Sequence, residues 1–380
     1  MFKLLRKYGL LLVVLGLLLQ AWLLSSNFPW LNNATLFSPA HRATPAFAKV
    51  NRNLEGPQKP GRMQRPDFQT GVIFPQWGQT AYGPEDPYWQ VGLAEIQQQT
   101  AAQWIAMTIN FSQSSPFATQ VQSAKNTPTP QVVAAGIGRA RAMGYHLFVQ
   151  PLITIQGQHP WAGYIQFTTT QEAHAWFDSY WRIFKPYVVA AAQAGAEELA
   201  LGTEYEMLQR YWGAEWNQLI SRVHTVFPGM LTYDINWTTL NYPIPSWMHS
   251  PWLNFIGVSV YISLTDVPRR LEAKVVPSLW REKIRKALDA FSAQLRKPVL
   301  ISEIGYRDSP DALYNPWEMQ KLTGTDPEEQ AAAYAAALQN SILDPHITGI
   351  FFWAWSFPLF APNGKPASRV LYDWYTSPLA

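Results

Sequence analysis

The chain has 380 residues, a net charge of +3, no cysteine and seven histidines. The lack of cysteine excludes disulfides, thiolate catalysis and zinc–thiolate sites, and the histidines show no metal-ligand spacing, so we expect neither a metal nor a cofactor. The length is ample for an α/β barrel, which commonly uses roughly 250 residues as one domain. The 18 Trp, 17 Tyr and 19 Phe suit a large core or, where Trp lies near loops, surfaces that stack on sugars.

The positive charge is concentrated at the N-terminal end of the chain. Residues 1–68 contain nine of the 29 basic side chains and two of the 26 acidic ones, so the rest of the chain is net acidic. Domains that bind nucleic acid carry a basic patch or stripe, and the body of this chain offers none. We therefore expect no nucleic-acid partner.

Residues 1–26 have the pattern of a membrane anchor or a signal segment. Lys3, Arg6 and Lys7 precede an apolar run from Tyr8 to Leu24, and no small-residue cleavage site follows closely. We favour an uncleaved, single-pass anchor in the cell membrane that leaves the body outside the cytoplasm, whereas cleavage would give a secreted protein. Residues 27–68 are rich in Pro, Asn, Ala and Arg without apolar periodicity, which predicts a disordered, flexible linker.

Eight strand-like segments lie between residues 69 and 380, and all but the fifth are followed by a helix-like segment. The predicted strands are Val72–Phe74, Trp104–Phe111, Tyr145–Ile153, Leu199–Leu201, Met230–Trp237, Phe255–Ile262, the stretch from Pro298 to Tyr306, and Thr348–Trp355. The predicted helices are Asp86–Gln103, Pro130–Met143, Gln171–Ala194, Ala214–Phe227, Val276–Leu295, Asp326–Leu343 and Ser368–Tyr375. This alternation predicts an α/β fold, a (β/α)8 or TIM barrel, that forms one catalytic domain over residues 69–380. A doubly wound open sheet is the alternative, but no glycine-rich phosphate loop follows the first strand.

Two of the predicted strands end on a carboxylate. Glu204 follows the fourth strand and Glu303 lies at the end of the seventh. Catalytic groups of such barrels come from the carboxyl ends of strands, and a pair of carboxyl groups about 5–5.5 Å apart suits a retaining glycosidase. The alternative is that both glutamates form surface ion pairs.

The chain resembles glycoside hydrolase family 113, a family of β-mannanases, over most of residues 70–357. The resemblance is carried by five blocks in order: Leu201-Gly202-Thr203-Glu204, Leu231-Thr232-Tyr233 through Asn236-Trp237, Phe255 to Tyr261, Ser302 to Arg307, and Phe352-Trp353-Ala354-Trp355. It implies that Glu204 is the acid/base and Glu303 the nucleophile. Two positions depart from the pattern: Ser259 stands where an acid is usual, and the third strand reads Gln150-Pro151-Leu152 in place of a Lys-Pro-His-like segment.

Several aromatic and amide side chains are candidates for substrate binding. Tyr261 is expected to hydrogen-bond Glu303, and an indole at position 353 or 355, on one strand face, to form the floor beneath the cleaved sugar. For each aromatic residue, a place in the core is the competing interpretation. The full candidate set is Tyr261, Asn236, Trp237, Trp353, Trp355, Trp77, Trp161 and Tyr306.

Together these features predict a retaining glycoside hydrolase. Its expected substrate is a β-linked glycan, either β-mannan or a related hexose polymer or oligosaccharide, cleaved by double displacement with two glutamates. A barrel that binds envelope polysaccharide without cleaving it, or that transfers the sugar to another acceptor, is the alternative. We expect a monomer that meets the membrane through its N-terminal segment.

Overall fold

The computed structural model describes residues 65, 67–157, 160–322 and 324–377. The predicted anchor and nearly all of the predicted linker lie outside these residues. Phe68, which the sequence assigned to the linker, belongs to the core and is 3% exposed. Within the described ranges, no helix has the length and hydrophobicity needed to cross a bilayer.

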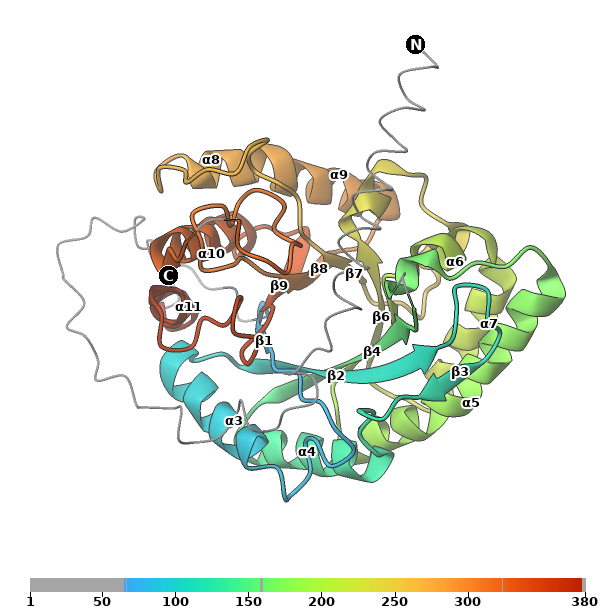
Figure 1. Ribbon diagram of the computed structural model, residues 1–380. Helices are drawn as coiled ribbons and strands as arrows, with labels where there is room; N and C mark the ends of the chain where they lie inside the picture. The colour runs from blue at the N-terminus through green and yellow to red at the C-terminus, as the bar shows by residue number, and fades with distance from the viewer. Residues whose placement is uncertain (1–64, 66, 158–159, 323, 378–380) are drawn as a thin grey trace, which may run out of the picture.

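Eight parallel strands form a closed barrel, as predicted (Figure 1). In barrel order they are β1 (Gln69–Ile73), β2 (Trp104–Gln113), β4 (His146–Ile155), β5 (Glu198–Thr203), β6 (Met230–Asn236), β7 (Ile256–Ser259), β8 (Val299–Ile304) and β9 (Ile347–Phe352). The ring closes because β1 pairs with both β2 and β9. The doubly wound alternative is therefore wrong, since an open sheet has two edges and this ring has none.

A ninth strand lies outside the ring and was not predicted. Strand β3 (Val121–Ser123) pairs antiparallel with the C-terminal end of β2, between Phe111 and Gln113. Because β2 extends beyond its pairing with β1, the two strands form a ribbon that rises above the mouth of the barrel on one side. This ribbon becomes one wall of the site.

Helices surround the barrel on the outside (Figure 1). They are α3 (Pro87–Thr100), α4 (Pro130–Ala142), α5 (Thr170–Ala194), α6 (Glu206–Tyr211), α7 (Gly213–His224), α8 (Val276–Trp280), α9 (Lys286–Leu295), α10 (Pro327–Ser341) and α11 (Pro366–Tyr375), with a π turn at Arg281–Arg285 joining α8 to α9. Short 3-10 helices occur at Ala162–Tyr164, Trp237–Asn241 and Ser246–His249. Asp326 is the N-cap of α10 and accepts a hydrogen bond from the backbone N–H of Glu329 at 3.1 Å, which stabilises the start of the helix.

The core has two parts. A small cluster fills the interior of the barrel and includes Ile73, Phe148, Leu300 and Phe351, while a larger cluster lies between strands and helices. Gly71 is needed beside this inner cluster, because a Cβ there would lie 2.3 Å from the Phe351 ring. The interior is packed with side chains, so a ligand has access only to the mouth.

The two ends of the described chain are joined where the ring closes. The hydroxyl of Tyr375 in α11 donates to the carbonyl oxygen of Gly71 in β1 at 3.2 Å. The amide of Asn363 donates to the carboxylate of Glu95 in α3 at 3.1 Å. The last helix therefore fastens to the first strand and the first helix of the ring.

Candidate active site

Glu204 lies directly after β5, at the mouth of the barrel. Its backbone has a φ of 59°, in the left-handed region that a glutamate seldom adopts, and its N–H donates to the carbonyl oxygen of Asp234 at 2.8 Å. Two side chains orient the carboxylate: the indole N–H of Trp161 donates to Oε2 at 2.7 Å, and the amide of Asn236 donates to Oε1 at 3.0 Å. Donors from the loop after β4 and from the end of β6 therefore hold Glu204 in one orientation.

Glu303 reaches the mouth from β8, where a register shift relative to β7 occurs. The hydroxyl of Tyr261, two residues beyond the end of β7, donates to Glu303 Oε1 at 2.5 Å, as expected from the sequence. The backbone N–H of Val260 donates to the carbonyl oxygen of Glu303 at 2.7 Å. Both the main chain and the side chain of Glu303 are thus fixed by the segment that follows β7.

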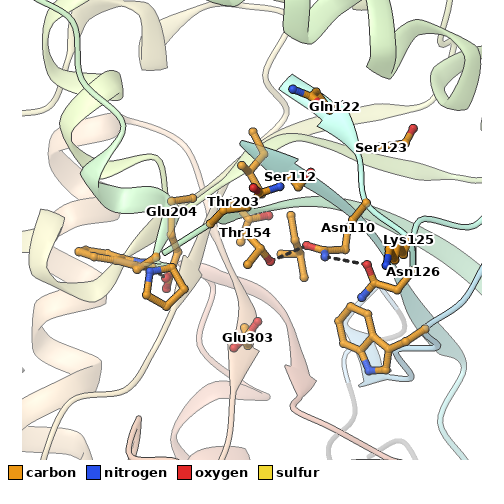
Figure 2. Close-up of a pocket in the computed structure, with 18 of the residues that line it drawn as sticks. Asn110, Ser112, Gln122, Ser123, Lys125, Asn126, Thr154, Thr203, Glu204 and Glu303 are labelled. Carbon is orange, nitrogen blue, oxygen red and sulfur yellow. Dashed lines mark hydrogen bonds between the residues drawn. The ribbon is translucent and has the colours of Figure 1, made fainter. Parts of the chain in front are cut away.

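Glu204 and Glu303 line the same cleft, which has a volume of about 700 Å³ (Figure 2). They come from the fourth and seventh strands of the ring, and Figure 2 shows both carboxyl groups at one end of the cleft. The alternative of two surface ion pairs is wrong, because the hydrogen bonds to these carboxylates come from Trp161, Asn236 and Tyr261.

Burial raises the pKa of both carboxyl groups. For Glu204 the hydrogen bonds from Trp161 and Asn236 oppose that rise. For Glu303 burial acts together with the negative charge of Glu204, and the hydrogen bond from Tyr261 opposes them, leaving the pKa well above its usual range. Two carboxyl groups in one poorly solvated cleft compete for ionisation, so the pair favours one proton and one negative charge.

A buried carboxyl group, Asp234, lies below the pair. It is 0% exposed, and burial raises its pKa to about 8. Its carboxyl oxygens accept hydrogen bonds from Ser302 at 2.5 Å, Ser259 at 3.4 Å and Gln150 at 3.3 Å. The two residues that depart from the family pattern, Ser259 and Gln150, therefore serve to satisfy a buried acid that links β4, β6, β7 and β8.

The structure separates the other predicted sugar-binding residues into two groups. Trp77, Trp161 and Trp353 line the cleft, and Trp237 packs edge-on against Tyr261 with ring centroids 5.8 Å apart. Trp355 and Tyr306 instead lie in the core, 2% and 1% exposed, and neither lines the cleft. The expectation that the indoles at positions 353 and 355 share a face is wrong, because β9 ends at Phe352 and strand alternation ends with it.

Some lining residues were missed in the sequence. Asn110 of β2 accepts a hydrogen bond from the Thr154 hydroxyl at 3.0 Å and donates to Asn126 at 3.4 Å, and Lys125 lies beside Asn126 in the loop after β3 (Figure 2). Asn110 and Thr154 stand near the carboxyl ends of predicted strands, which was a usable signal. Lys125 and Asn126 had no such signal, because their place depends on β3.

Comparison with known proteins identifies the family. The profile of Glycoside Hydrolase Family 113 matches residues 84–376. The chain belongs to glycoside hydrolase family 113. It is therefore a glycoside hydrolase, as predicted, and the match spans both Glu204 and Glu303.

Solved structures of family 113 members share the fold. The GH113 β-mannanase AaManA from Alicyclobacillus acidocaldarius, in complex with ManMIm, is 20% identical, with a TM-score of 0.70 over 81% of this chain and 97% of that chain. A complex of a GH113 β-1,4-mannanase is also 20% identical, with a TM-score of 0.68 over 82% and 99%. A family 5 mannosidase from Rhizomucor miehei is 9% identical, with a TM-score of 0.53 over 83% and 97%. No curated protein matches this chain.

Proposed function

We propose that this family 113 enzyme cleaves β-mannan, or a related β-linked hexose polymer or oligosaccharide, with retention of configuration. Glu303 is the nucleophile and Glu204 the acid/base. The observation that carries the proposal is the placement of both carboxyl groups in one cleft, each held by donors from neighbouring elements. The substrate class is supported by the family 113 structures named above, which are β-mannanases.

In the first step the Glu303 carboxylate attacks the anomeric carbon of the bound sugar. Tyr261 holds Oε1, so Oε2 is the oxygen that forms the new ester bond. The glycosidic C–O bond breaks as Glu204 transfers its proton to the leaving oxygen. The products are a glycosyl ester on Glu303, a free alcohol end and an ionised Glu204.

In the second step a water molecule attacks the same carbon. Glu204, now ionised, removes the proton of that water, and the ester bond breaks to restore the Glu303 carboxylate. Glu204 must therefore gain and lose one proton in each cycle, which works best when its pKa lies near the working pH. Burial raises that pKa, while Trp161 and Asn236 lower it, and these opposing effects suit the alternating role.

Azide rescue tests the two roles separately. Glu303→Ala with azide is expected to release an inverted glycosyl azide, because azide attacks from the face that the nucleophile has vacated. Glu204→Ala is expected to lower kcat about 10²- to 10⁴-fold, as loss of a general acid does, and azide should then give a product of retained configuration. A Glu303→Ala enzyme that yields no inverted azide product would remove Glu303 from the role of nucleophile.

A panel of polysaccharides tests the substrate. Reducing ends released from mannan, glucan, xylan and galactan by the wild-type enzyme should be greatest for mannan. Activity on another member of the panel, with none on mannan, would refute the mannan assignment while leaving the two-glutamate mechanism in place. Product analysis at high acceptor concentration separates hydrolysis from transfer to a sugar.

We also propose that residues 1–26 anchor the enzyme in the cell membrane with its barrel outside the cytoplasm. The support is the basic flank followed by the apolar run from Tyr8 to Leu24. Fractionation of cells that express the full chain should place the activity in the membrane pellet, and protease added outside should degrade the barrel. Activity in the growth medium would instead indicate that the segment is cleaved.

A further inference from the structure

A pair of stacked indoles, one exposed and one half-buried, lies outside the lining of the cleft. Trp317, in the loop between β8 and α10, stacks on Trp237 with ring centroids 5.3 Å apart and an angle of 23° between the planes. The Trp317 side chain is 40% exposed, whereas tryptophan side chains are on average highly buried. Trp237 contacts Tyr261, which holds Glu303, so the pair is continuous with the reacting groups.

The loop that carries Trp317 is built around a buried arginine. Arg307 is 0% exposed, and its Nη1 donates to the carbonyl oxygens of Asn315 at 2.9 Å and Glu318 at 3.0 Å, which bracket Trp317. Its Nη2 donates to the carbonyl oxygen of Asp311 at 2.9 Å, and Asp311 also pairs with it through its carboxylate. The backbone around Trp317 is therefore held in place, and an ordered aromatic surface loses little entropy when it binds a ligand.

The position of this pair in the ring indicates which part of a glycan would contact it. Trp237 follows the fifth strand of the ring and the Trp317 loop follows the seventh, whereas Asn110 and Thr154 of the cleft belong to the second and third. A line across the mouth from the second or third strand to the fifth passes between the ends of the fourth and seventh, where Glu204 and Glu303 lie. A linear glycan that touches both Asn110 and the Trp237–Trp317 pair must therefore pass between Glu204 and Glu303.

We propose that Trp317, stacked on Trp237, is a sugar-binding platform that receives a hexose ring of the glycan on the opposite side of the cleavage point from the Asn110 wall. The inference rests on the proposed function for the identity of the glycan. With sugar rings held on both sides of the carboxyl groups, the enzyme attacks bonds inside a chain rather than at its end. The apolar C–H face of the ring packs on the indole, and the Trp237–Tyr261 contact fixes the distance from the platform to Glu303.

The test compares Trp317→Ala and Trp317→Phe with a matched control, Trp252→Ala. Trp252 is also an exposed indole, 48% exposed and stacked on His224 at 3.8 Å, but it precedes β7 and so lies at the opposite end of the barrel. The first measurement is kcat/KM for manno-oligosaccharides of increasing length. The second is the retardation of each protein in native gels that contain mannan, glucan, xylan or galactan.

In the wild type, kcat/KM should rise as the substrate becomes longer. In Trp317→Ala that rise should be about three- to tenfold smaller, as expected for loss of one aromatic contact. The Trp317→Ala variant should also lose gel retardation, while Trp317→Phe keeps most of both and Trp252→Ala keeps the wild-type values. Values for Trp317→Ala within twofold of the wild type in both measurements would overturn the platform, as would a wild type that none of the four polysaccharides retards. If the wild type does not act on mannan but is retarded by another glycan, the proposed substrate is refuted. The platform is still supported in that case if Trp317→Ala abolishes the retardation.

Discussion

Replacing Tyr261 by Phe tests whether its hydroxyl favours the ionised form of Glu303, the proposed nucleophile. The change removes one hydroxyl, which donates to Glu303 Oε1 at 2.5 Å, and leaves the ring that packs against Trp237. Deleting a hydrogen bond to a charged group costs about 1.5–3 kcal/mol, so kcat/KM should fall by about 10- to 150-fold near neutral pH. The variant tests whether that hydroxyl acts on the charge of the carboxylate or only on its position.

The sign of the pH effect follows from the direction of the shift. Tyr261 lowers the pKa of Glu303, so its loss raises that pKa further and the carboxylate ionises only at higher pH. The acidic limb of kcat/KM should move upward by about one to two pH units, because one pKa unit corresponds to about 1.36 kcal/mol. Activity lost at pH 5 should therefore return in part at pH 8.

The assay is kcat/KM from pH 4 to 9 on a soluble mannan or manno-oligosaccharide, with Tyr306→Phe as the control. Tyr306 is also buried, but its hydroxyl accepts from the Trp280 indole at 3.2 Å and contacts no carboxylate. The control should change stability without moving the acidic limb. A Tyr261→Phe enzyme with an unshifted limb and kcat/KM within threefold of the wild type would falsify the electrostatic role.

Three further changes have distinct readouts. Trp161→Phe removes a hydrogen-bond donor to Glu204 and so raises the pKa of the Glu204 carboxyl group. The alkaline limb of the pH profile of kcat should therefore move up by about one pH unit, and an unchanged alkaline limb would contradict this. Asp234 has a native pKa of about 8 against about 3.9 in the unfolded chain, so its contribution to stability is complete below pH 4 and is lost as pH rises to 8. Between pH 5 and pH 8, urea unfolding should show the free energy of unfolding of Asp234→Asn rising by about 3.5 kcal/mol relative to that of the wild type. A constant difference would mean that the group is ionised when folded. Arg307→Met removes the cation that pairs with the buried Asp311 carboxylate and should lower the free energy of unfolding by about 3–5 kcal/mol. A loss under 1 kcal/mol would show that the loop does not depend on the arginine.

The barrel and the placement of Glu204 and Glu303 in one cleft were predictable because both depend on repeated local patterns. Each buried strand is a short apolar run, and the polar residue that ends it marks the mouth. Tyr261 follows β7 and Glu303 lies near the end of the neighbouring strand β8, so their contact could be expected from chain order and register alone. The strand limits differ by a few residues, as at Gln113 and Ile155, where β2 and β4 run on above the ring.

The features that the sequence did not predict depend on contacts distant in the chain. Strand β3 has three residues, too few for a period to appear, and it exists because β2 extends far enough to pair with it. Trp355 lies beyond the last residue of β9, so alternation along the strand no longer decides where it points. The partners of Arg307, which are Asp311 and four backbone carbonyls in its own loop, likewise depend on how that loop folds.

The closure of the ring by β1 has a consequence for biosynthesis. Strand β1 needs β9 as a partner, and about 270 residues must leave the ribosome between them. Until then the growing chain presents an unpaired strand edge on either side, and such edges invite pairing with other chains. Folding of a protein of this design should therefore place a heavy demand on chaperones, and a truncation before Ile347 should yield aggregates rather than a smaller enzyme.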